Sequence, residues 1–191
     1  MSQLQSLLSG DRERSRILGL VHSLHLPDCW IGAGFVRNAV WDHLHGMPRS
    51  KPDGDVDVIW FDPRRAQPGE DKALEERLRT LDAGVHWSVK NQCLMHLRND
   101  DPPYMSALDA LRFWPETATA VAVRHTEQGV VEIAAPFGLD DLFDMIVRPT
   151  PRFGVARREL YLDRVRTKQW LRIWPSLRLA DASDHRALTV A

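Results

Sequence analysis

Lys51-Pro-Asp-Gly-Asp55-Val-Asp57-Val-Ile-Trp-Phe-Asp62 is a turn that leads into a short apolar strand. Alternate residues of a strand share a face, so Asp55 and Asp57 point one way and the valine between them points the other. Two like charges held side by side repel each other, and a divalent cation would compensate, so the pattern predicts a magnesium site. The alternative is a pair of solvated turn carboxylates, because Pro-Asp-Gly is common in turns.

A second short apolar strand, Cys29-Trp-Ile-Gly-Ala-Gly34, comes before this stretch and ends in a glycine turn. A helical pattern over residues 35–45 follows it directly. A strand that enters a helix through glycines leaves backbone N–H groups free at the positive end of the helix dipole, which is typical of an anion site. The predicted phosphate ligands are this turn and the polar residues of the first helical turn: Gly32, Gly34, Arg37 and Asn38.

The same glycine turn also permits a dinucleotide-binding fingerprint, as in an oxidoreductase. Arg37 stands at the third glycine position of that fingerprint, and the next strand carries its acids at its start. Asp62, at the far end of that strand, could still imitate the ribose-binding acid. The oxidoreductase interpretation therefore stays open as a lesser alternative.

The remaining pattern predicts further helices over residues 12–26, 70–81, 105–114, 139–147 and 157–174. It also predicts a strand over 85–93 and a hairpin that joins 118–124 to 130–135. At 191 residues the chain suits one domain with a buried core. We expect an α+β domain over residues 1–178, with a basic C-terminal helix from about 156, and a frayed tail over 179–191.

Composition and charge narrow the class of protein. No stretch approaches the roughly 18 consecutive apolar residues of a membrane span, and the N-terminus is polar, so we expect a cytoplasmic protein without a membrane partner. Residues 148–178 hold nine Arg and Lys against Glu159 and Asp163, a local excess of +7 in a chain whose net charge is −1. Such asymmetry predicts a phosphate-rich ligand between this basic segment and the acidic remainder of the chain. The alternative is that the basic residues form a solvated helix face.

Taken together, Ile31-Gly-Ala-Gly-Phe-Val-Arg-Asn38 and the later Gly-Asp55-Val-Asp57-Val-Ile-Trp-Phe resemble the nucleotidyltransferase superfamily, which has the DNA polymerase beta-like fold. Its members include DNA polymerase beta, the tRNA CCA-adding enzymes and the aminoglycoside nucleotidyltransferases. The rest of the chain resembles an uncharacterised bacterial branch of nucleotidyltransferase-like proteins. The stretches that carry this second resemblance are Trp87-Ser-Val-Lys-Asn-Gln92, Met95-His-Leu-Arg-Asn99, Pro103-Tyr104, Ala110-Leu-Arg-Phe-Trp-Pro-Glu-Thr-Ala118 and Ala135-Pro-Phe-Gly-Leu-Asp-Asp-Leu-Phe143.

The resemblance implies a mixed sheet flanked by helices, with Asp55 and Asp57 as catalytic ligands of Mg²⁺ or Mn²⁺. It also implies a third carboxylate on a neighbouring strand, for which Glu132 is the first candidate and Asp109 the second. Lys90, Asn91 and His96 would line the acceptor side; alternatively they form structural hydrogen bonds at a strand end.

The expected activity is transfer of a nucleoside monophosphate from a nucleoside triphosphate to an acceptor, which could be a small molecule, a protein or RNA. The main alternative is a catalytically inactive module that binds a nucleotide or nucleic acid. That alternative draws on the missing third carboxylate and on the basic helix, where Trp170 and Trp174 could stack on bases. A core role for these two residues is the other interpretation.

Overall fold

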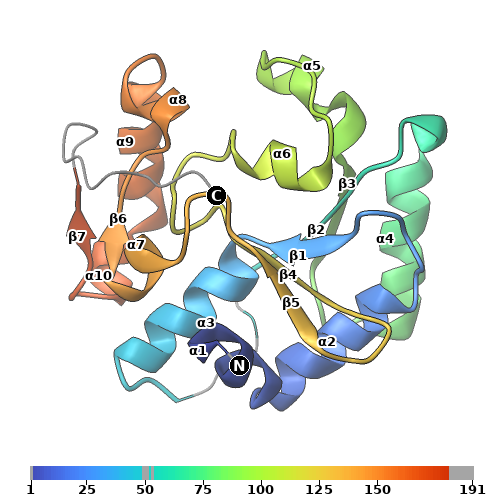
Figure 1. The fold of residues 1–191 in the computed structure, drawn as a ribbon, viewed down its shortest axis with the longest axis horizontal. Helices are drawn as coiled ribbons and strands as arrows, with labels where there is room; N and C mark the ends of the chain where they lie inside the picture. The colour runs from blue at the N-terminus through green and yellow to red at the C-terminus, as the bar shows by residue number, and fades with distance from the viewer. Residues whose placement is uncertain (1, 49–51, 53, 181–191) are drawn as a thin grey trace.

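The computed structural model of the protein describes residues 2–48, 52 and 54–180 (Figure 1). Its strands are β1 (Trp30–Gly32), β2 (Val56–Trp60), β3 (Trp87–Asn91), β4 (Ala122–His125), β5 (Val131–Ala134), β6 (Ile146–Val147) and β7 (Arg178–Leu179). Its α-helices are α1 (Gln3–Ser9), α2 (Arg12–His22), α3 (Gly34–Leu44), α4 (Glu70–Leu81), α5 (Met95–Asn99), α6 (Ala107–Leu111), α7 (Asp140–Phe143), α8 (Pro151–Gly154), α9 (Arg158–Lys168) and α10 (Trp170–Ile173). Two 3-10 helices are η1 (Pro63–Arg65) and η2 (Gln92–Leu94).

A five-stranded sheet in the order β3-β2-β1-β4-β5 forms the centre of the molecule. β2 and β3 are parallel, whereas β1 is antiparallel to both of its neighbours and β4 is antiparallel to β5. Asp57 stands opposite Ser88 in the parallel pair, and Ile31 stands opposite Val58 in the antiparallel one. This mixed sheet, flanked by helices, confirms the predicted α+β class.

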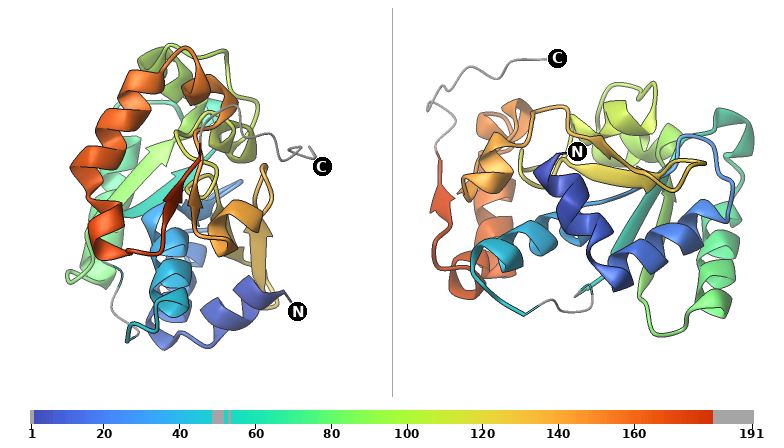
Figure 2. Two further views of the ribbon diagram at one scale, coloured as in Figure 1. Left: turned by 90° about the vertical axis from the view of Figure 1, so that its left-hand side faces the viewer. Right: turned by 60° about the horizontal axis from the view of Figure 1, so that its bottom comes forward.

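The two faces of the sheet are covered differently. Val56, Val58 and Trp60 of β2 point into the larger core, which α1, α2, α3 and α4 help to fill. Figure 2 shows the first three of these helices together on one side of the sheet. Ile59 points the other way, into a smaller core beneath α6. Because side chains alternate along a strand, Asp57 belongs to this second face.

Several helices differ in length from the pattern that predicted them. α2 begins as expected, with the Asp11 carboxylate accepting the N–H of Arg14 at 3.0 Å, but it ends at His22 and not at residue 26. His25 has a positive φ of 50°, which closes the helix before Pro27. The helix predicted over 157–174 is divided into α9 and α10 because Gln169 adopts a left-handed conformation. The helix predicted over 139–147 is the short α7, followed by β6.

Residues 151–180, here called the C-terminal arm, pack against α3. Trp170 and Trp174 meet the ring of Trp41 edge-on, with ring centres 5.8 Å and 5.2 Å away. The indole N–H of Trp174 also donates to Asp42 at 2.9 Å. Figure 2 shows α9 running along one side of the molecule. The arm therefore shares a hydrophobic core with the sheet.

The end of the arm differs from the predicted tail. Arg178–Leu179 forms β7, which pairs in parallel with β6. The sequence predicted fraying from residue 179 onward, but Leu179 belongs to this strand pair. The rest of the predicted tail, residues 181–191, lies outside the described residues. Within the part of the chain that the structure describes, no helix has the length and apolar character needed to cross a membrane.

Candidate active site

A cleft of about 260 Å³ lies where the glycine turn, the start of β2 and the C-terminal arm meet. Five residues singled out from the sequence line it: Gly34, Arg37, Asn38, Asp55 and Asp57. The arm contributes Arg164, Lys168, Trp170, Ile173 and Trp174 to the opposite wall. The fold thus brings three segments that are far apart in the sequence around one space.

The charges of the two carboxylates affect each other at one side of this cleft. Burial raises the pKa of Asp57 above its usual value, and the charge of Asp55 raises it further. A hydrogen bond from Ser88 on β3 and the positive charges of Arg164 and Lys168 act in the opposite direction. The pair is therefore electrostatically strained without a cation, as the alternation of the strand predicted.

The carboxylate oxygens of Asp55 and Asp57 supply only part of the ligands that a hard divalent cation needs. Carboxylate oxygens are the ligands that Mg²⁺ prefers, and protein Mg²⁺ sites often use one or two of them with substrate phosphates and water completing the shell. No group of three or more His, Cys, Asp or Glu able to hold a metal occurs among residues 2–48, 52 and 54–180. Asp55 and Asp57 could hold Mg²⁺ together with a bound phosphate chain, and no third protein ligand joins them within those residues.

The glycine turn presents the start of α3 to the cleft. Ala33 precedes the helix with φ 55° and ψ −128°, and no side chain caps the helix N-terminus. Uncapped N–H groups at a helix start favour an anion. Gly32 lies behind the turn, where an added Cβ would stand 2.7 Å from the Trp114 ring, so its role is close packing.

Arg37 forms the back wall of the cleft and is only 6% exposed. Its two amino groups donate to the Thr119 hydroxyl and to the Asn38 side-chain oxygen, both at 2.9 Å. The guanidinium lies 4.4 Å from the centre of the Trp170 ring. Burial lowers the pKa of Arg37 to about 10, and the charge of Glu116 opposes that shift. Arg37 supplies positive charge, but its amino groups already have partners.

Three residues predicted for the acceptor side do not line the cleft. β2 and β3 are parallel, so the end of β3 lies beside the end of β2, away from Asp57 at its start. Lys90 forms an ion pair with Glu75 at 2.8 Å. Asn91 is buried, and its side chain forms hydrogen bonds with neighbouring loops. The ring of His96 contacts the ring of Tyr104 edge-on. Their acceptor role stays a prediction that the geometry does not favour.

The candidates for a third carboxylate are also elsewhere. Glu132 lies on β5, three strands from β2, and its carboxylate accepts from Arg124 at 2.7 Å. Asp109 accepts the backbone N–H of Met105 in the turn that starts α6. Neither residue lines the cleft with Asp55 and Asp57.

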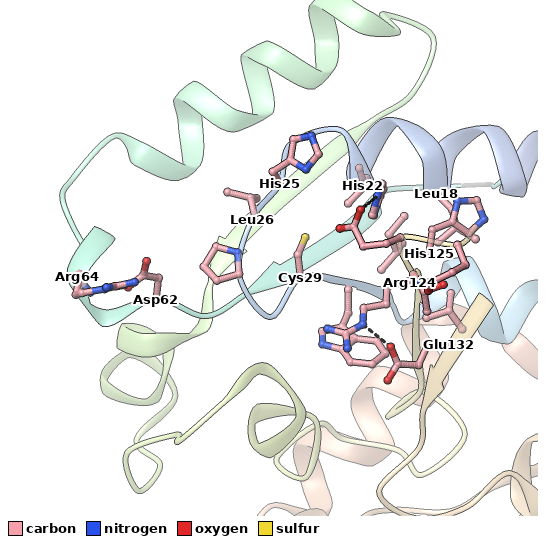
Figure 3. A pocket seen from close by; sticks show the side chains of 18 residues that line it. Leu18, His22, His25, Leu26, Cys29, Asp62, Arg64, Arg124, His125 and Glu132 are labelled. Carbon is pink, nitrogen blue, oxygen red and sulfur yellow. Dashed lines mark hydrogen bonds and ion pairs between the residues drawn. The ribbon is translucent and has the colours of Figure 1, made fainter. Parts of the chain in front are cut away.

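The larger cavity that contains Glu132, about 630 Å³, lies at the other end of the sheet strands (Figure 3). Four of its charged side chains are already paired with one another: Arg124 with Glu132, and Arg64 with Asp62. Burial raises the pKa of its Cys29 thiol to about 12, so this sulfur is protonated at neutral pH. Size alone therefore does not make this cavity the active site.

The tryptophans of the arm are packed as core residues, although both also line the cleft. Trp170 and Trp174 are both buried, and their rings contact Trp41 and Arg37. The sequence prediction missed Arg164 as a site residue and also Glu116, which binds it. For Arg164 the signal was the basic excess of residues 148–178, which indicates a ligand type and names no residue; Glu116 lies in the stretch Ala110–Ala118 that resembles the bacterial branch, which gave it no role.

The mixed sheet, the glycine turn before α3 and the aspartate pair at the start of β2 define a nucleotidyltransferase-like protein. The family model described as Nucleotidyltransferase matches residues 19–179, and the chain belongs to that family. The fold also argues against the dinucleotide-binding alternative, because β1 is antiparallel to both neighbours where that fingerprint requires a parallel strand–helix–strand unit.

Solved structures support the same assignment. A domain determined by NMR and described as a CCA-adding enzyme head domain is 35% identical, with a TM-score of 0.83 over 94% of this chain and 95% of that chain. A CCA-adding enzyme in complex with CTP is 13% identical, with a TM-score of 0.61 over 95% of this chain and 44% of that one. The Thermotoga maritima CCA-adding enzyme complexed with tRNA is 14% identical, with a TM-score of 0.60 over 96% of this chain and 43% of that chain.

The two CCA-adding enzymes share the fold at low identity, and this chain spans less than half of their length. No curated protein matches the chain. The family match and the 35% identical domain confirm the resemblance to the nucleotidyltransferase superfamily. The ligands of the longer enzymes are properties of those enzymes.

Proposed function

We propose that this protein is a Mg²⁺-dependent nucleotidyltransferase, which moves a nucleoside monophosphate from a nucleoside triphosphate to an acceptor hydroxyl. The observation that carries the proposal is the meeting of the glycine turn, Arg37 and the aspartate pair in one cleft. These are an anion-binding backbone, a fixed positive charge and a pair of strained carboxylates, which together match a metal-bound polyphosphate.

In this mechanism the protein mainly supplies position and charge. The acceptor oxygen bonds to the α-phosphorus, the bond from that phosphorus to the bridging oxygen breaks, and pyrophosphate leaves; the hydroxyl proton passes to water. Asp55 and Asp57 would hold Mg²⁺, which supplies positive charge at the attacking and leaving oxygens when bound. The N-terminus of α3, with Gly34 and the charge of Arg37 behind it, would orient the β- and γ-phosphates.

The acceptor side is open to three classes: small molecules, proteins and RNA. RNA is the first class to test, because a structural neighbour is complexed with tRNA. Manganese is the alternative ion, since both ions favour carboxylate and water ligands.

The test is incubation of the full chain with each of four α-³²P-labelled nucleoside triphosphates and Mg²⁺ or Mn²⁺, with tRNA or a cell extract as acceptor. Label transfer and pyrophosphate release by the wild type, both lost in Asp55→Asn/Asp57→Asn, would support the proposal. The matched control is Glu76→Gln/Asp163→Asn, which removes two exposed carboxylates outside the cleft and should transfer label like the wild type.

A second candidate function is a catalytically inactive nucleotide- or nucleic-acid-binding module. It is favoured by the lack of a third carboxylate beside the pair within the described residues. Metal-dependent nucleotide binding without any transfer or pyrophosphate release would select this module. Absence of binding to any nucleotide and to any nucleic acid would exclude both candidates.

A further inference from the structure

Glu116 is a buried carboxylate behind the cleft, and its side chain is 1% exposed. One oxygen accepts from the Nε of Arg164 at 2.8 Å. Its other oxygen is buried without a hydrogen-bond partner in the described part of the chain, as is the Nε of Arg37. A buried carboxylate is costly unless it is paired, and Glu116 lies near two arginines, Arg164 and Arg37.

Arg164 differs from Arg37 in what it can offer a ligand. Its side chain is 34% exposed at the cleft, and Glu116 binds it through Nε alone. A guanidinium held at Nε keeps its two terminal amino groups as a planar fork, which suits two oxygens of a phosphate. Arg37, in contrast, is buried and donates from both amino groups to protein oxygens.

The direction of α9 supports the same distinction. Lys168 lies one helical turn after Arg164 and lines the same cleft. Both positive charges act on Asp57. Arg166, two residues after Arg164, is 72% exposed and is absent from the cleft lining. The helix therefore presents one cationic stripe, formed by Arg164 and Lys168, to the carboxylate pair.

We propose that Arg164 binds the phosphate chain of the nucleotide directly, and that Glu116 is the positioning residue that aims it. This inference rests on the proposed function and deepens it, because it makes the C-terminal arm a wall of the nucleotide site. Glu116 also allows two guanidinium groups to stand close together at the back of the cleft. A long arginine side chain loses less freedom on binding a ligand when a carboxylate already holds it.

The competing explanation is that the Glu116–Arg164 pair only fastens α9 to the body. If the pair only holds α9 in place, its removal should lower the stability of the protein by the same amount with or without a bound nucleotide. A phosphate-binding role would change affinity according to the number of phosphates on the ligand. The ratio of affinities for ATP, ADP and AMP therefore separates the two explanations.

The experiment is calorimetric titration of the full chain with ATP, ADP and AMP, each with Mg²⁺, with folding checked by circular dichroism. Arg164→Gln should weaken ATP binding by about tenfold to about a hundredfold, in line with the loss of charge-assisted hydrogen bonds. AMP affinity should change by less than about twofold in this variant. The matched control is Arg166→Gln, which removes the same charge from the same helix and should bind ATP like the wild type.

Glu116 is tested through its effect on Arg164. Glu116→Gln should weaken ATP binding, and Glu116→Gln/Arg164→Gln should be no weaker than Arg164→Gln alone, because Glu116 acts through Arg164. Arg164→Lys keeps the charge without the fork and should recover only part of the affinity. If a Glu116 variant fails to fold, the Arg164 variants decide the question.

The outcomes also separate this inference from the proposed function. Wild-type binding of ATP with no loss in Arg164→Gln would overturn the inference and leave the proposed function standing. Equal losses for ATP and AMP would assign the pair a fastening role and would also overturn it. A wild type that binds no nucleotide with Mg²⁺ would overturn the proposed function, and this inference with it.

Discussion

Asp57 shows that residues of the site are held at a cost to stability. Burial and the charge of Asp55 raise the pKa of its carboxyl above the ordinary value of about 3.9. At a pH between the unfolded and the folded pKa, the folded protein therefore holds a proton on Asp57 that the unfolded chain has lost. Stability falls as the pH rises from the unfolded pKa to the folded one, and the full cost is present at pH 7.

We expect Asp57→Asn to raise the free energy of unfolding by ~1 kcal/mol at pH 7 without metal, because it removes this cost. The gain should vanish near pH 3, where the wild-type carboxyl is protonated in both states. Urea unfolding of both proteins at the two pH values measures it, with Asp163→Asn as the exposed control. A variant that is less stable than the wild type at pH 7 would contradict the electrostatic reading.

Two glycines of one turn have different roles, and alanine separates them. A Cβ on Gly32 would stand 2.7 Å from the Trp114 ring and 3.3 Å from the Val121 carbonyl oxygen, so Gly32→Ala should cost about 2 kcal/mol of stability. At Gly34 the nearest atom would be 3.6 Å away, which is ordinary contact, so Gly34→Ala should fold normally.

Gly34→Ala should nevertheless weaken ATP binding by about tenfold, because its methyl group faces the cleft where a phosphate would approach the backbone. Thermal unfolding and calorimetric titration of both variants measure the two effects. Full affinity in a folded Gly34→Ala protein would argue against phosphate binding at this turn.

At the scale of elements, the end of β3 is held by one side chain. The Asn91 oxygen accepts the N–H groups of Asp62 and Cys93, and its amide donates to the carbonyls of Asp62 and Arg65. These four bonds join the loop after β2 to the loop after β3. A structural role of this kind needs no ligand.

We therefore expect Asn91→Ala to lower the free energy of unfolding by about 2–4 kcal/mol, since it leaves buried backbone groups without partners. Its affinity for ATP, measured where the variant is folded, should equal that of the wild type. Chemical denaturation and titration measure the two quantities. A stable variant with altered transfer to the acceptor would restore the acceptor role predicted from the sequence.

At the scale of the whole molecule, a cluster of tryptophans joins the C-terminal arm to the body. Trp174 packs on Trp41 and donates to Asp42, so Trp174→Ala should cost about 3–5 kcal/mol. Since the arm carries Arg164, ATP affinity should fall together with stability. Leu171→Ala, at an exposed position of α10, is the control and should change neither.

Calorimetry with guanidinium unfolding checks this prediction. Body and arm share one core, so wild type and variant should each unfold in a single transition. Two separate transitions in the wild type would show that the arm is an independent unit.

The sequence by itself determined the class of the protein and five of the residues that line its cleft. Asp55 and Asp57 share a face because a strand has a period of two, and the glycine turn predicts an anion site because it opens a helix. These are local rules that act within a few residues. The resemblance to the nucleotidyltransferase superfamily rests on the same two stretches.

Only the tertiary structure decided which distant residues complete the site. Arg164 lies more than a hundred positions from Asp57 and reaches it because the tryptophans of the arm pack on α3. Glu116 reaches Arg164 through the loop before β4. Conversely, the direction of β3 and the order of the strands place Lys90 and Glu132 away from the cleft. Strand order and helix packing arise from the burial of whole faces, which no local spacing encodes.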